Sequence, residues 1–593
     1  MTIYNAPVRD IQFILNDLLK IERFDNLEGF SEVNSELITA IIEEGSKIAR
    51  EELLPLNKIG DEQGCRLEDG QVRVPDAFHD AYNHYVEGGW GGLTCDPEYG
   101  GQGLPGIVSA GIVEMMSSCN MAFTMYPGLT RGAYSAILAH ASDDLKARYL
   151  PKMATGEWSG TMNLTESHCG TDLGQIRSKA EPAEDGSYTI TGQKIFISAG
   201  DHDMAENIIH LVLAKVPGGP DGVKGISLFI VPKFLVKEDG SVGERNGVST
   251  GSIEEKMGIH GNSTCVLNYE EAKGWMVGPE HSGLKAMFTM MNEARWGVGM
   301  QGLSQSEISY QNAAQYARDR LQGRALTGPQ EPDKAADPII VHPDVRRMLM
   351  NQKAFNEGAR AFLYYIALKI DIAHRHPEES ERQAADEFVT LTTPVAKGYI
   401  TDKAFEYCVS AQQVFGGHGY ITEYGMDQFV RDARISMIYE GTNGIQALDL
   451  VGRKLPRHGG QAIRAFGEEL KGFIADNADS DDMQAFTRPL AAVAERLEKA
   501  TMWLVQNGMA NPDNAGAAAT DYMHLFGITS LAYMWAMMAR EALEKQSEGD
   551  NYYANKLVTA QYFMDRIVPE SASRLALIES GSESVMALDA EAF

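Results

Sequence analysis

The sequence predicts a mostly helical protein with a β domain in the middle of the chain. Apolar residues recur with helical spacing from about residue 34 to 149, and again from 284 to 455. Between these regions, residues 156–279 contain short segments rich in β-branched residues and separated by turns. Helices and strands that occur in separate blocks argue against a doubly wound α/β fold, in which the two alternate. They indicate a β domain between two helical domains.

The elements can be justified in order along the chain. Helical spacing is clear in Leu37, Ile38, Ile41 and Ile42, and β-branched strands are expected within residues 188–232. A loop is expected at 327–337, and a further helical block follows a break at 455–460 that contains proline and glycine. The expected parts are an N-terminal extension (1–35), a helical domain (36–155), a β domain (156–282), a second helical domain (283–456) and a C-terminal helical domain (457–593).

A glycine-rich loop in the first helical domain contains a formal GxGxxG pattern at Gly101, Gly103 and Gly106. A dinucleotide-binding fingerprint needs an apolar strand directly before it, and residues 93–98 (LTCDPE) do not predict one. Pro105 also lies inside the pattern. We therefore expect no Rossmann-type site in this loop.

Composition excludes several classes of protein. The net charge of −30 argues against nucleic-acid binding, because phosphate contacts need a basic surface. The six cysteines lie far apart and there is no secretory signal, so we expect reduced thiols and a cytoplasmic protein. The uncharged run 523–539 falls short of the roughly 20 apolar residues that a membrane span needs. It predicts a buried helix, and the interrupted apolar stretch 11–15 predicts an amphipathic one.

Residues 438–446 (IYEGTNGIQ) form the most informative motif, because they place the carboxylate of Glu440 between apolar residues and a Gly-Thr turn. A carboxylate held among apolar neighbours has a raised pKa and becomes a stronger base, suited to removing a proton from carbon. Taken alone, the motif is explained at least as well by a surface glutamate at a helix end. The rest of the chain has to decide between the two interpretations.

Five further motifs precede Glu440. In order they are 164–172 (LTESHCGTD), 194–198 (KIFIS), 292–295 (NEAR), 317–324 (ARDRLQGR) and 411–420 (AQQVFGGHGY). The first combines short hydroxyls with glycine, which permits the close backbone approach that a flavin edge and a pyrophosphate require. A zinc site formed by His168 and Cys169 is a weaker interpretation, because no further ligand follows at metal spacing. The six motifs and the order of the domains resemble those of the flavin-dependent acyl-CoA dehydrogenases.

The resemblance implies that Glu440 is the catalytic base. A minority of the family takes its base from the position just before the arginine of the 292–295 motif. That position is Ala294 here. Alanine cannot act as a base, and the neighbouring Glu293 points about 100° away around a helix. We therefore expect Glu440 rather than Glu293. The motif that contains Arg295 is expected to open the long helix.

The resemblance also implies FAD as the cofactor. Its flavin and pyrophosphate contacts would come from Met162, Leu164, Thr165, Thr171, Phe196 and Ser198. Ser198 would reach flavin N5 and Phe196 would cover the ring. The residues that would meet the adenosine part of a neighbouring subunit's cofactor are Arg320, Gln322, Gln413 and Gly417, and the cofactor set is completed by Thr442 and Gly444. The expected substrate contacts are Thr171, Asn292, Arg295, Tyr439 and Gly441.

The activity implied is α,β-dehydrogenation of an acyl-CoA thioester to a trans-2-enoyl-CoA, with Glu440 removing the α-proton and a hydride passing to flavin N5. Electron-transfer flavoprotein as the acceptor and a homodimer are expected with it. The two terminal extensions resemble a subgroup of long chains that includes 3-(methylthio)propanoyl-CoA dehydrogenases and broad-chain fatty acyl-CoA dehydrogenases. The alternatives are an acyl-CoA oxidase, a nitroalkane oxidase (whose base is aspartate) and a non-enzymatic DNA-associated member, which the charge of −30 disfavours.

Overall fold

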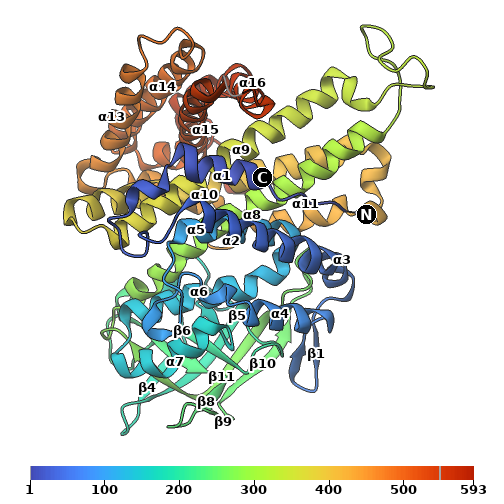
Figure 1. Cartoon of the computed structure of the whole chain (residues 1–593). Helices are drawn as coiled ribbons and strands as arrows, with labels where there is room; N and C mark the ends of the chain where they lie inside the picture. The colour runs from blue at the N-terminus through green and yellow to red at the C-terminus, as the bar shows by residue number, and fades with distance from the viewer. Residues whose placement is uncertain (1, 547–548) are drawn as a thin grey trace. The chain divides into compact units, whose positions relative to one another are not determined.

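A computed structural model describes residues 2–546 and 549–593 of the chain. The chain forms two compact units. We call Glu44–Gly297 the middle unit, and Met1–Glu43 together with Val298–Phe593 the terminal unit. Figure 1 shows the strands of the main sheet in the middle unit and long helices in the terminal unit. The prediction of a mostly helical chain with a central β domain and an added C-terminal helical domain is confirmed.

The middle unit begins with helices. They are the end of α2 (Ser35–Ile48), then α3 (Leu54–Gln63), α4 (Ala77–Glu87), α5 (Gly106–Cys119), α6 (Met121–His140) and α7 (Asp143–Thr155). The glycine-rich loop between α4 and α5 has no strand directly before it, only turns and two short 3-10 helices, Trp90–Gly92 and Pro97–Tyr99. A side chain at Gly101 would lie 2.1 Å from the carbonyl oxygen of Cys95, so this glycine serves tight packing of the loop on itself. A dinucleotide fingerprint would need a strand that leads directly into the loop, and the described residues before it form none.

A seven-stranded sheet forms the core of the middle unit. Its strands are β3 (Trp158–Asn163), β4 (Lys179–Pro182), β5 (Tyr188–Ser198), β6 (Asn207–Lys215), β7 (Ile226–Pro232), β10 (Val248–Ile253) and β11 (Thr264–Val277). The order is β10-β11-β5-β4-β6-β3, with β7 pairing with both β11 and β6. β6 runs parallel to β3 and antiparallel to β7. Because β6 and β7 are covered on both faces, they are apolar along most of their length. Two hairpins, β1–β2 (Arg66–Glu68, Gln71–Arg73) and β8–β9 (Phe234–Val236, Val242–Arg245), complete the unit.

Two apolar clusters hold this unit together. One lies where α6 and α7 pack on β3, and its centre includes the fully buried Trp158. The other fills the opposite face of the sheet, with Ile190, Val212 and Phe229. The first turns of α8 join the former cluster through Met287 and Met290. The sheet is therefore enclosed on both sides, which fixes the strands that carry the motifs described below.

The terminal unit is helical in its described residues. The second helical domain contains α8 (Gly283–Asp319), α9 (Pro343–Arg375), α10 (Glu379–Val414), α11 (Met426–Ile435) and α12 (Asn443–Asp449), with the first part of α8 lying in the middle unit. α8 begins at Gly283, so Asn292 and Arg295 lie more than two turns inside it, and the expectation that they open the helix is wrong. The apolar spacing that begins at residue 284 agrees with this start, whereas the motif at 292–295 suggested a later one.

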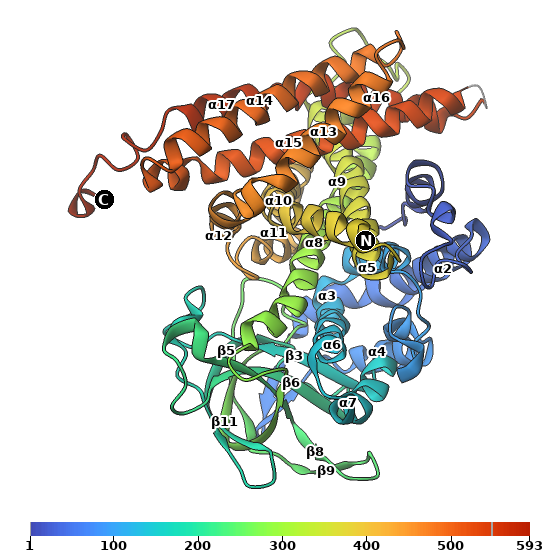
Figure 2. The same ribbon diagram turned by 90° about the vertical axis from the view of Figure 1, so that its left-hand side faces the viewer.

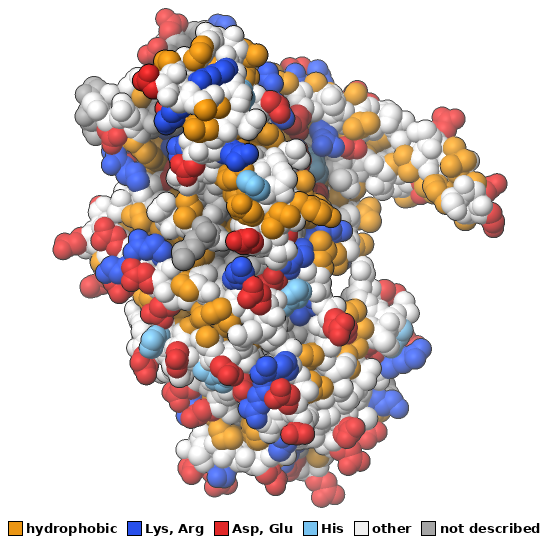
Figure 3. All heavy atoms as spheres, turned by 90° about the vertical axis from the view of Figure 1, so that its right-hand side faces the viewer, with side chains coloured by type: hydrophobic (Ala, Val, Ile, Leu, Met, Phe, Trp, Pro, Cys, Tyr) orange, Lys and Arg blue, Asp and Glu red, His pale blue; other side chains and the backbone are white. Residues whose placement is uncertain are grey.

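The C-terminal helices are α13 (Gln461–Asp476), α14 (Gln484–Gly508), α15 (Pro512–Lys545), α16 (Asn551–Arg566) and α17 (Glu570–Glu579). α14, α15 and α17 lie side by side (Figure 2). The uncharged run 523–539 is buried inside α15, as expected. Nowhere in 2–546 and 549–593 does a helix combine the length and apolarity needed to cross a membrane. On the face drawn in Figure 3, acidic and basic side chains are interspersed.

The N-terminal segment, α1 (Val8–Gln12) and a π-helical turn (Phe13–Leu18), is packed into the terminal unit. Its apolar residues are buried, in agreement with an amphipathic helix. Asp10, which the sequence places among the residues that interrupt the apolar stretch, is buried as well. It pairs there with Arg360 of α9 and Lys556 of α16. A carboxylate can be buried at this position because two cations compensate its charge.

Candidate functional site

The first two motifs of the β domain meet in the middle unit. The backbone N–H of Ile195 in β5 donates to the carbonyl of Thr165, which follows β3, at 2.9 Å. The buried Lys194 ammonium donates to the carbonyl of Leu164 at 3.0 Å and to the Glu166 carboxylate at 2.9 Å. Met162, Leu164 and Thr165 are half-buried at the end of β3. Two segments that the sequence separates by about 30 residues therefore form one surface.

Glu166 anchors the loop that joins these motifs. Its carboxylate accepts from the backbone N–H of Arg177 (2.7 Å), from the N–H and hydroxyl of Ser178 (3.1 and 2.7 Å) and from Lys194. Burial by itself raises the pKa of Glu166, but the Lys194 charge and these hydrogen bonds outweigh it and lower that pKa. Burial also lowers the pKa of Lys194, against the effect of the ion pair. The Glu166–Lys194 ion pair stabilises the loop from its buried side. Thr171, in the same loop, is exposed.

Phe196 has an unusual backbone conformation that presents its ring to solvent. Its φ is +58°, and its side chain is 59% exposed although it belongs to the central strand β5. A left-handed residue interrupts the strict alternation of a strand, so Ile197 stays buried while Phe196 points outward and Ser198 is half-buried. An exposed aromatic ring two positions from a hydroxyl suits a planar, largely apolar ring system with a polar edge. These residues thus fit a flavin.

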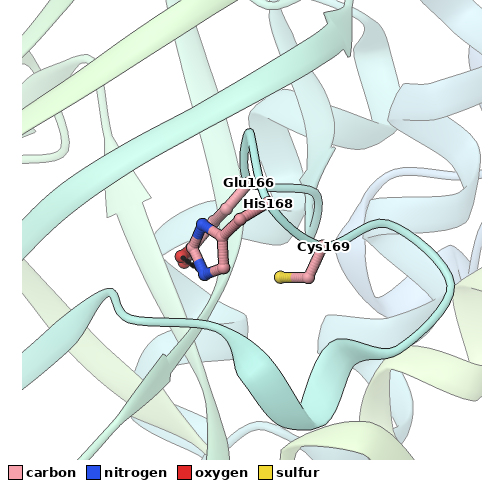
Figure 4. A group of neighbouring side chains, drawn as sticks. All are labelled: Glu166, His168 and Cys169. Atoms are coloured by element: carbon pink, nitrogen blue, oxygen red, sulfur yellow. Dashed lines mark ion pairs between the residues drawn. The ribbon is translucent and has the colours of Figure 1, made fainter.

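Glu166, His168 and Cys169 form a group of three ligand-type side chains (Figure 4). Their ligand atoms lie within 4.8 Å of one another. Four facts argue against a metal ion. The Glu166 oxygens already accept four hydrogen bonds, the Lys194 ammonium lies beside them, and His168 Nε2 is hydrogen-bonded to the carbonyl of Gln175 at 2.9 Å. Burial raises the pKa of the Cys169 thiol, which disfavours the thiolate that zinc requires.

The 292–295 motif on α8 contains two of the expected substrate contacts, and they differ in exposure. The Asn292 side chain is exposed, whereas Arg295 is buried, with a residue exposure of 8%. Glu293 and Ala294 are half-buried. Asn292 is therefore available to a ligand, and Arg295 is fixed by its surroundings.

Glu440 lies in the terminal unit, in the short irregular segment between α11 and α12. Its φ is +58°, and Gly441 follows with a φ of +80°. The left-handed region is open to glycine but costs other residues about 1 kcal/mol or more, so it persists only where the surroundings impose it. The Glu440 residue is half-buried. A half-buried carboxylate held in a left-handed conformation within an irregular turn is a candidate functional position.

Two side chains hold this turn by its carbonyl groups. Gln446 Nε2 donates to the carbonyl of Glu440 at 2.8 Å, and Lys397 Nζ from α10 donates to the carbonyl of Gly441 at 2.8 Å. Both side chains are buried. Lys397 also donates to Asn443 Oδ1 at 2.6 Å. The peptide group between the two left-handed residues and the peptide group that follows them are therefore fixed by an amide and a charge-assisted hydrogen bond.

The residues that flank Glu440 have definite roles in the turn. Tyr439 donates its hydroxyl to Gln301 Oε1 on α8, and burial raises its pKa well above the ordinary value. Thr442 caps α12, because its Oγ1 accepts from the N–H of Ile445 at 3.4 Å. Gly444 is exposed in the first turn of α12.

The expected adenosine tracts also meet each other. Tyr316 of α8 stacks on Phe415, with ring centroids 4.1 Å apart, and its hydroxyl lies 2.8 Å from His418 Nδ1. This contact ties the end of α8 to the glycine-rich turn after α10. The four expected residues at these two tracts, all exposed, are Arg320, Gln322, Gln413 and Gly417. An extra methyl at Gly417 would meet no described atom within 4 Å, so this surface is open to a ligand.

Sequence reasoning missed three residues of the site. Lys397 and Asn443 hold the turn of Glu440, and Asp402 Oδ1 accepts from Asn443 Nδ2 at 2.6 Å. One signal was present in the sequence, because Lys397 is the only charged residue between 388 and 401. A lysine inside such a run is buried only when it has partners.

Comparison with known proteins identifies the family of the chain. Four domain families match the chain in order: Acyl-CoA dehydrogenase, N-terminal domain (35–157), middle domain (161–272) and C-terminal domain (281–455), and Acetyl-CoA dehydrogenase C-terminal like (466–589). The chain therefore belongs to the acyl-CoA dehydrogenase family, a family of FAD-dependent enzymes.

Several full-length relatives carry specific names. The chain is 39% identical to the 3-methylmercaptopropionyl-CoA dehydrogenase of Ruegeria pomeroyi, over 98% of this chain and 99% of the relative. It is 34% identical to a butyryl-CoA dehydrogenase of Syntrophomonas wolfei, over 100% of this chain and 99% of that protein. It is 33% identical to the broad-specificity linear acyl-CoA dehydrogenase FadE5 of Mycobacterium tuberculosis, with both chains fully covered. The named substrates of these relatives differ.

Solved structures share the fold. Caenorhabditis elegans ACDH-11 in complex with C11-CoA superimposes with a TM-score of 0.77 at 17% identity, over 95% of this chain and 91% of that one. Acyl-CoA dehydrogenase complexed with FAD from Bacillus anthracis gives 0.76 at 21% identity, over 93% and 90%. Both likenesses extend through the C-terminal helices, which are thus part of an established long form of the fold.

Proposed function

We propose that the protein oxidises the α,β carbon–carbon bond of an acyl-CoA thioester to a trans-2-enoyl-CoA, with Glu440 as the base. The observation that carries the assignment of the base is the strained left-handed turn at Glu440, held through its own carbonyl and that of Gly441 by two buried side chains. Fixing the backbone that carries the carboxylate limits the positions that this side chain can take, and so reduces the entropy lost when substrate binds. FAD, when bound, supplies the acceptor for the hydride that leaves the β-carbon.

The residues of this chain have separate tasks in that reaction. Glu440 removes the proton from the α-carbon, which is a very weak acid, so a developing enolate needs stabilisation. In our proposal, the backbone N–H of Glu440 donates a hydrogen bond to the thioester carbonyl. Phe196, with its exposed ring, and Ser198, with its hydroxyl, are assigned to the flavin. Thr171 and Asn292, whose side chains are exposed, are assigned to the CoA thioester together with Arg295, Tyr439 and Gly441.

Substitution of the base tests this proposal. Glu440→Gln should still bind FAD and acyl-CoA, but anaerobic bleaching of the flavin by acyl-CoA should slow by at least about 100-fold, since a general base contributes roughly 10²–10⁴-fold. Glu293→Gln is the matched control, because Glu293 lies beside the position that supplies the base in a minority of the family. Bleaching of Glu440→Gln at the wild-type rate, or loss of bleaching only in Glu293→Gln, would refute the assignment.

The acyl group is a separate question. The named relatives act on a methylthio-substituted propanoyl thioester, a butanoyl thioester and linear acyl thioesters of broad range. We propose a linear acyl-CoA as substrate, with 3-(methylthio)propanoyl-CoA as the first candidate because its dehydrogenase is the relative of 39% identity. Bleaching rates across a series from butanoyl-CoA to long-chain acyl-CoA that includes the methylthio compound measure the preference. A rate for butanoyl-CoA above that for the methylthio compound would contradict this ranking.

Electron-transfer flavoprotein is the proposed acceptor of the electrons. One structural relative, 25% identical over 72% of this chain with a TM-score of 0.58, comes from work on the electron transferring flavoprotein of Acidaminococcus fermentans. Slow reoxidation of the bleached enzyme by O₂ and fast reoxidation by electron-transfer flavoprotein is the expected result. Fast reoxidation by O₂ would instead make the protein an acyl-CoA oxidase.

A homodimer in the cytoplasm completes the proposal. The exposed Arg320, Gln322 and Gln413 support it, because in the family such residues serve the cofactor of a neighbouring subunit. All six cysteines, each in the described part of the chain, are free thiols, which suits a reducing compartment. Light scattering of the FAD-loaded protein measures the oligomeric state, and a monomer would contradict this part.

A further inference from the structure

The turn that carries Glu440 is connected by side chains to the C-terminal helices. The first link is the amide of Asn443, which lies between a cation and an anion. Its Oδ1 accepts from Lys397 Nζ at 2.6 Å, and its Nδ2 donates to Asp402 Oδ1 at 2.6 Å and to Thr401 Oγ1 at 2.9 Å. An ammonium on one side and a carboxylate on the other allow only this orientation of the amide. Asn443 is therefore locked, and Lys397 is held toward the Gly441 carbonyl.

The second link leaves the second helical domain. The other oxygen of Asp402, Oδ2, lies 2.9 Å from Nε2 of His524, which belongs to α15 of the C-terminal domain. Across residues 2–546 and 549–593, nothing hydrogen-bonds to Nδ1 of His524. A carboxylate can only accept, so Nε2 carries the proton and donates it to Asp402. His524 thus fixes the one oxygen of Asp402 that Asn443 does not use.

Close helix packing keeps this link in register. A side chain at Gly398 of α10 would lie 2.3 Å from the sulfur of Met523, and one at Gly527 of α15 would lie 2.2 Å from the ring of Tyr399. Two glycines therefore let α10 and α15 approach one another on both sides of His524. His524 also meets the Tyr399 ring edge to face, with centroids 5.3 Å apart. The imidazole is constrained by packing as well as by its hydrogen bond.

We infer that His524 is a positioning residue for the catalytic turn: the C-terminal domain orients Glu440 through His524, Asp402, Asn443 and Lys397. Each hydrogen bond in this chain fixes the donor or acceptor of the next, and the last one fixes the carbonyl of Gly441, directly after the base. This inference rests on the proposed role of Glu440. The C-terminal helices would then contribute to the reaction, in addition to packing on the second helical domain.

Three substitutions on α15 test the inference. His524→Leu removes the donor at similar volume, and His524→Gln retains an N–H near the place of Nε2. Tyr522→Phe is the matched control, because the Tyr522 hydroxyl bonds Thr501 of α14 at 2.8 Å and has no part in the chain to Glu440. Each variant is measured as full-length, FAD-loaded protein for FAD content, thermal midpoint and anaerobic flavin reduction at saturating acyl-CoA. Hydrogen–deuterium exchange of peptides that cover residues 437–446 gives a readout independent of activity.

We expect His524→Leu to slow flavin reduction at saturation by roughly tenfold, because misplacing a catalytic group by a fraction of an ångström to 1 Å costs up to about 10²-fold. Peptides 437–446 should exchange several-fold faster, while FAD content stays that of wild type. His524→Gln should recover most of both effects, and Tyr522→Phe should show neither. If His524→Leu does not fold, Asp402→Asn interrupts the same chain from α10 and should loosen the same peptides.

The outcomes separate the inference from the proposed function. If His524→Leu reduces flavin and exchanges peptides 437–446 at wild-type rates, the inference is overturned and the proposed function is not affected. If Tyr522→Phe slows flavin reduction as much as His524→Leu does, the slowing reflects a general loss of stability, and the inference is overturned as well. If wild-type protein is not bleached by any acyl-CoA, the proposed function fails. The exchange of residues 437–446 then still shows whether His524 holds the turn.

Discussion

Replacing Asp10 with asparagine should destabilise the terminal unit, because Asp10 balances the charge of a buried cluster. The cluster contains three carboxylates and three cations: Asp10, Glu307, Glu357, Arg360, Lys353 and Lys556. Arg360 Nη1 lies 2.6 Å from Asp10 Oδ2, Tyr552 donates its hydroxyl to Oδ1 at 2.8 Å, and Lys556 also contacts Oδ1. Asparagine keeps the size of the side chain but leaves one positive charge uncompensated.

The magnitude follows from the burial of the partners. Arg360 and Lys556 are 1% and 2% exposed, so the excess charge cannot be solvated by water. Removing one member of a buried ion pair costs about 3–5 kcal/mol, because the remaining charge stays desolvated. That is roughly 10²–10⁴-fold in the equilibrium between folded and unfolded forms. Asp17→Asn is the control on the same segment. Its ion pair with Lys545 is 2.8 Å long but partly exposed, so its loss should cost about 1 kcal/mol or less.

Urea titrations followed by circular dichroism, with wild type and the two variants at several pH values, measure these effects. Burial by itself raises the pKa of Asp10, but Lys556 and Arg360 outweigh it and hold that pKa well below its ordinary value. A group with a depressed folded pKa contributes stability above its unfolded pKa of about 3.9 and loses it as the pH falls toward the folded pKa. The difference between wild type and Asp10→Asn should therefore be full near neutral pH and shrink below about pH 4. Equal midpoints for Asp10→Asn and Asp17→Asn, or a difference that grows in acid, would refute the reasoning.

Three other substitutions test the middle unit and a helix crossing. Phe196→Ala removes an exposed ring, so the thermal midpoint should stay within about 2 °C of wild type while FAD retention on gel filtration falls several-fold; unchanged retention would contradict the flavin role. Glu166→Gln leaves the buried Lys194 charge uncompensated, so the free energy of unfolding should fall by about 3–5 kcal/mol and FAD should be lost. A stable, FAD-loaded variant would show that the loop needs no ion pair. Gly527→Ala places a methyl 2.2 Å from the Tyr399 ring, so thermal unfolding should report a loss of about 1–3 kcal/mol; no loss would mean that α10 and α15 move apart freely.

The order of the elements was predictable from the sequence because it depends on local periodicity. The strand segments within 188–232 form β5, β6 and β7, and the run 523–539 is a buried helix. A motif was a poorer guide to where an element starts. α8 begins at Gly283, in agreement with the apolar spacing from residue 284, whereas the motif at 292–295 suggested a later start.

The loop at 327–337 shows where local reasoning stops. Its residues do form irregular structure, as predicted from proline and glycine. The loop is organised by Asp337, which is fully buried and accepts from the backbone N–H groups of Ala325, Gln330 and Glu331 and from Arg324. These hydrogen bonds lower the pKa of Asp337 to about 2, the backbone of Ala325 contributing most. The pattern of residue types identifies the loop. It does not show that the carboxylate of Asp337 accepts the hydrogen bonds that hold the loop together.

The sequence by itself determined the class of each element and the family, and it singled out the residue that we propose as the base, since these depend on periodicity and on short motifs that can be read without knowledge of the fold. Only the tertiary structure decided which charged residues are buried and with what. Asp10 and Arg360 are 350 positions apart, and His524 and Asp402 are 122 apart. Helical spacing states which face of a helix a residue occupies, but not which residue of a distant helix meets it. The burial of a charge depends on that partner, and so does the positioning of Glu440.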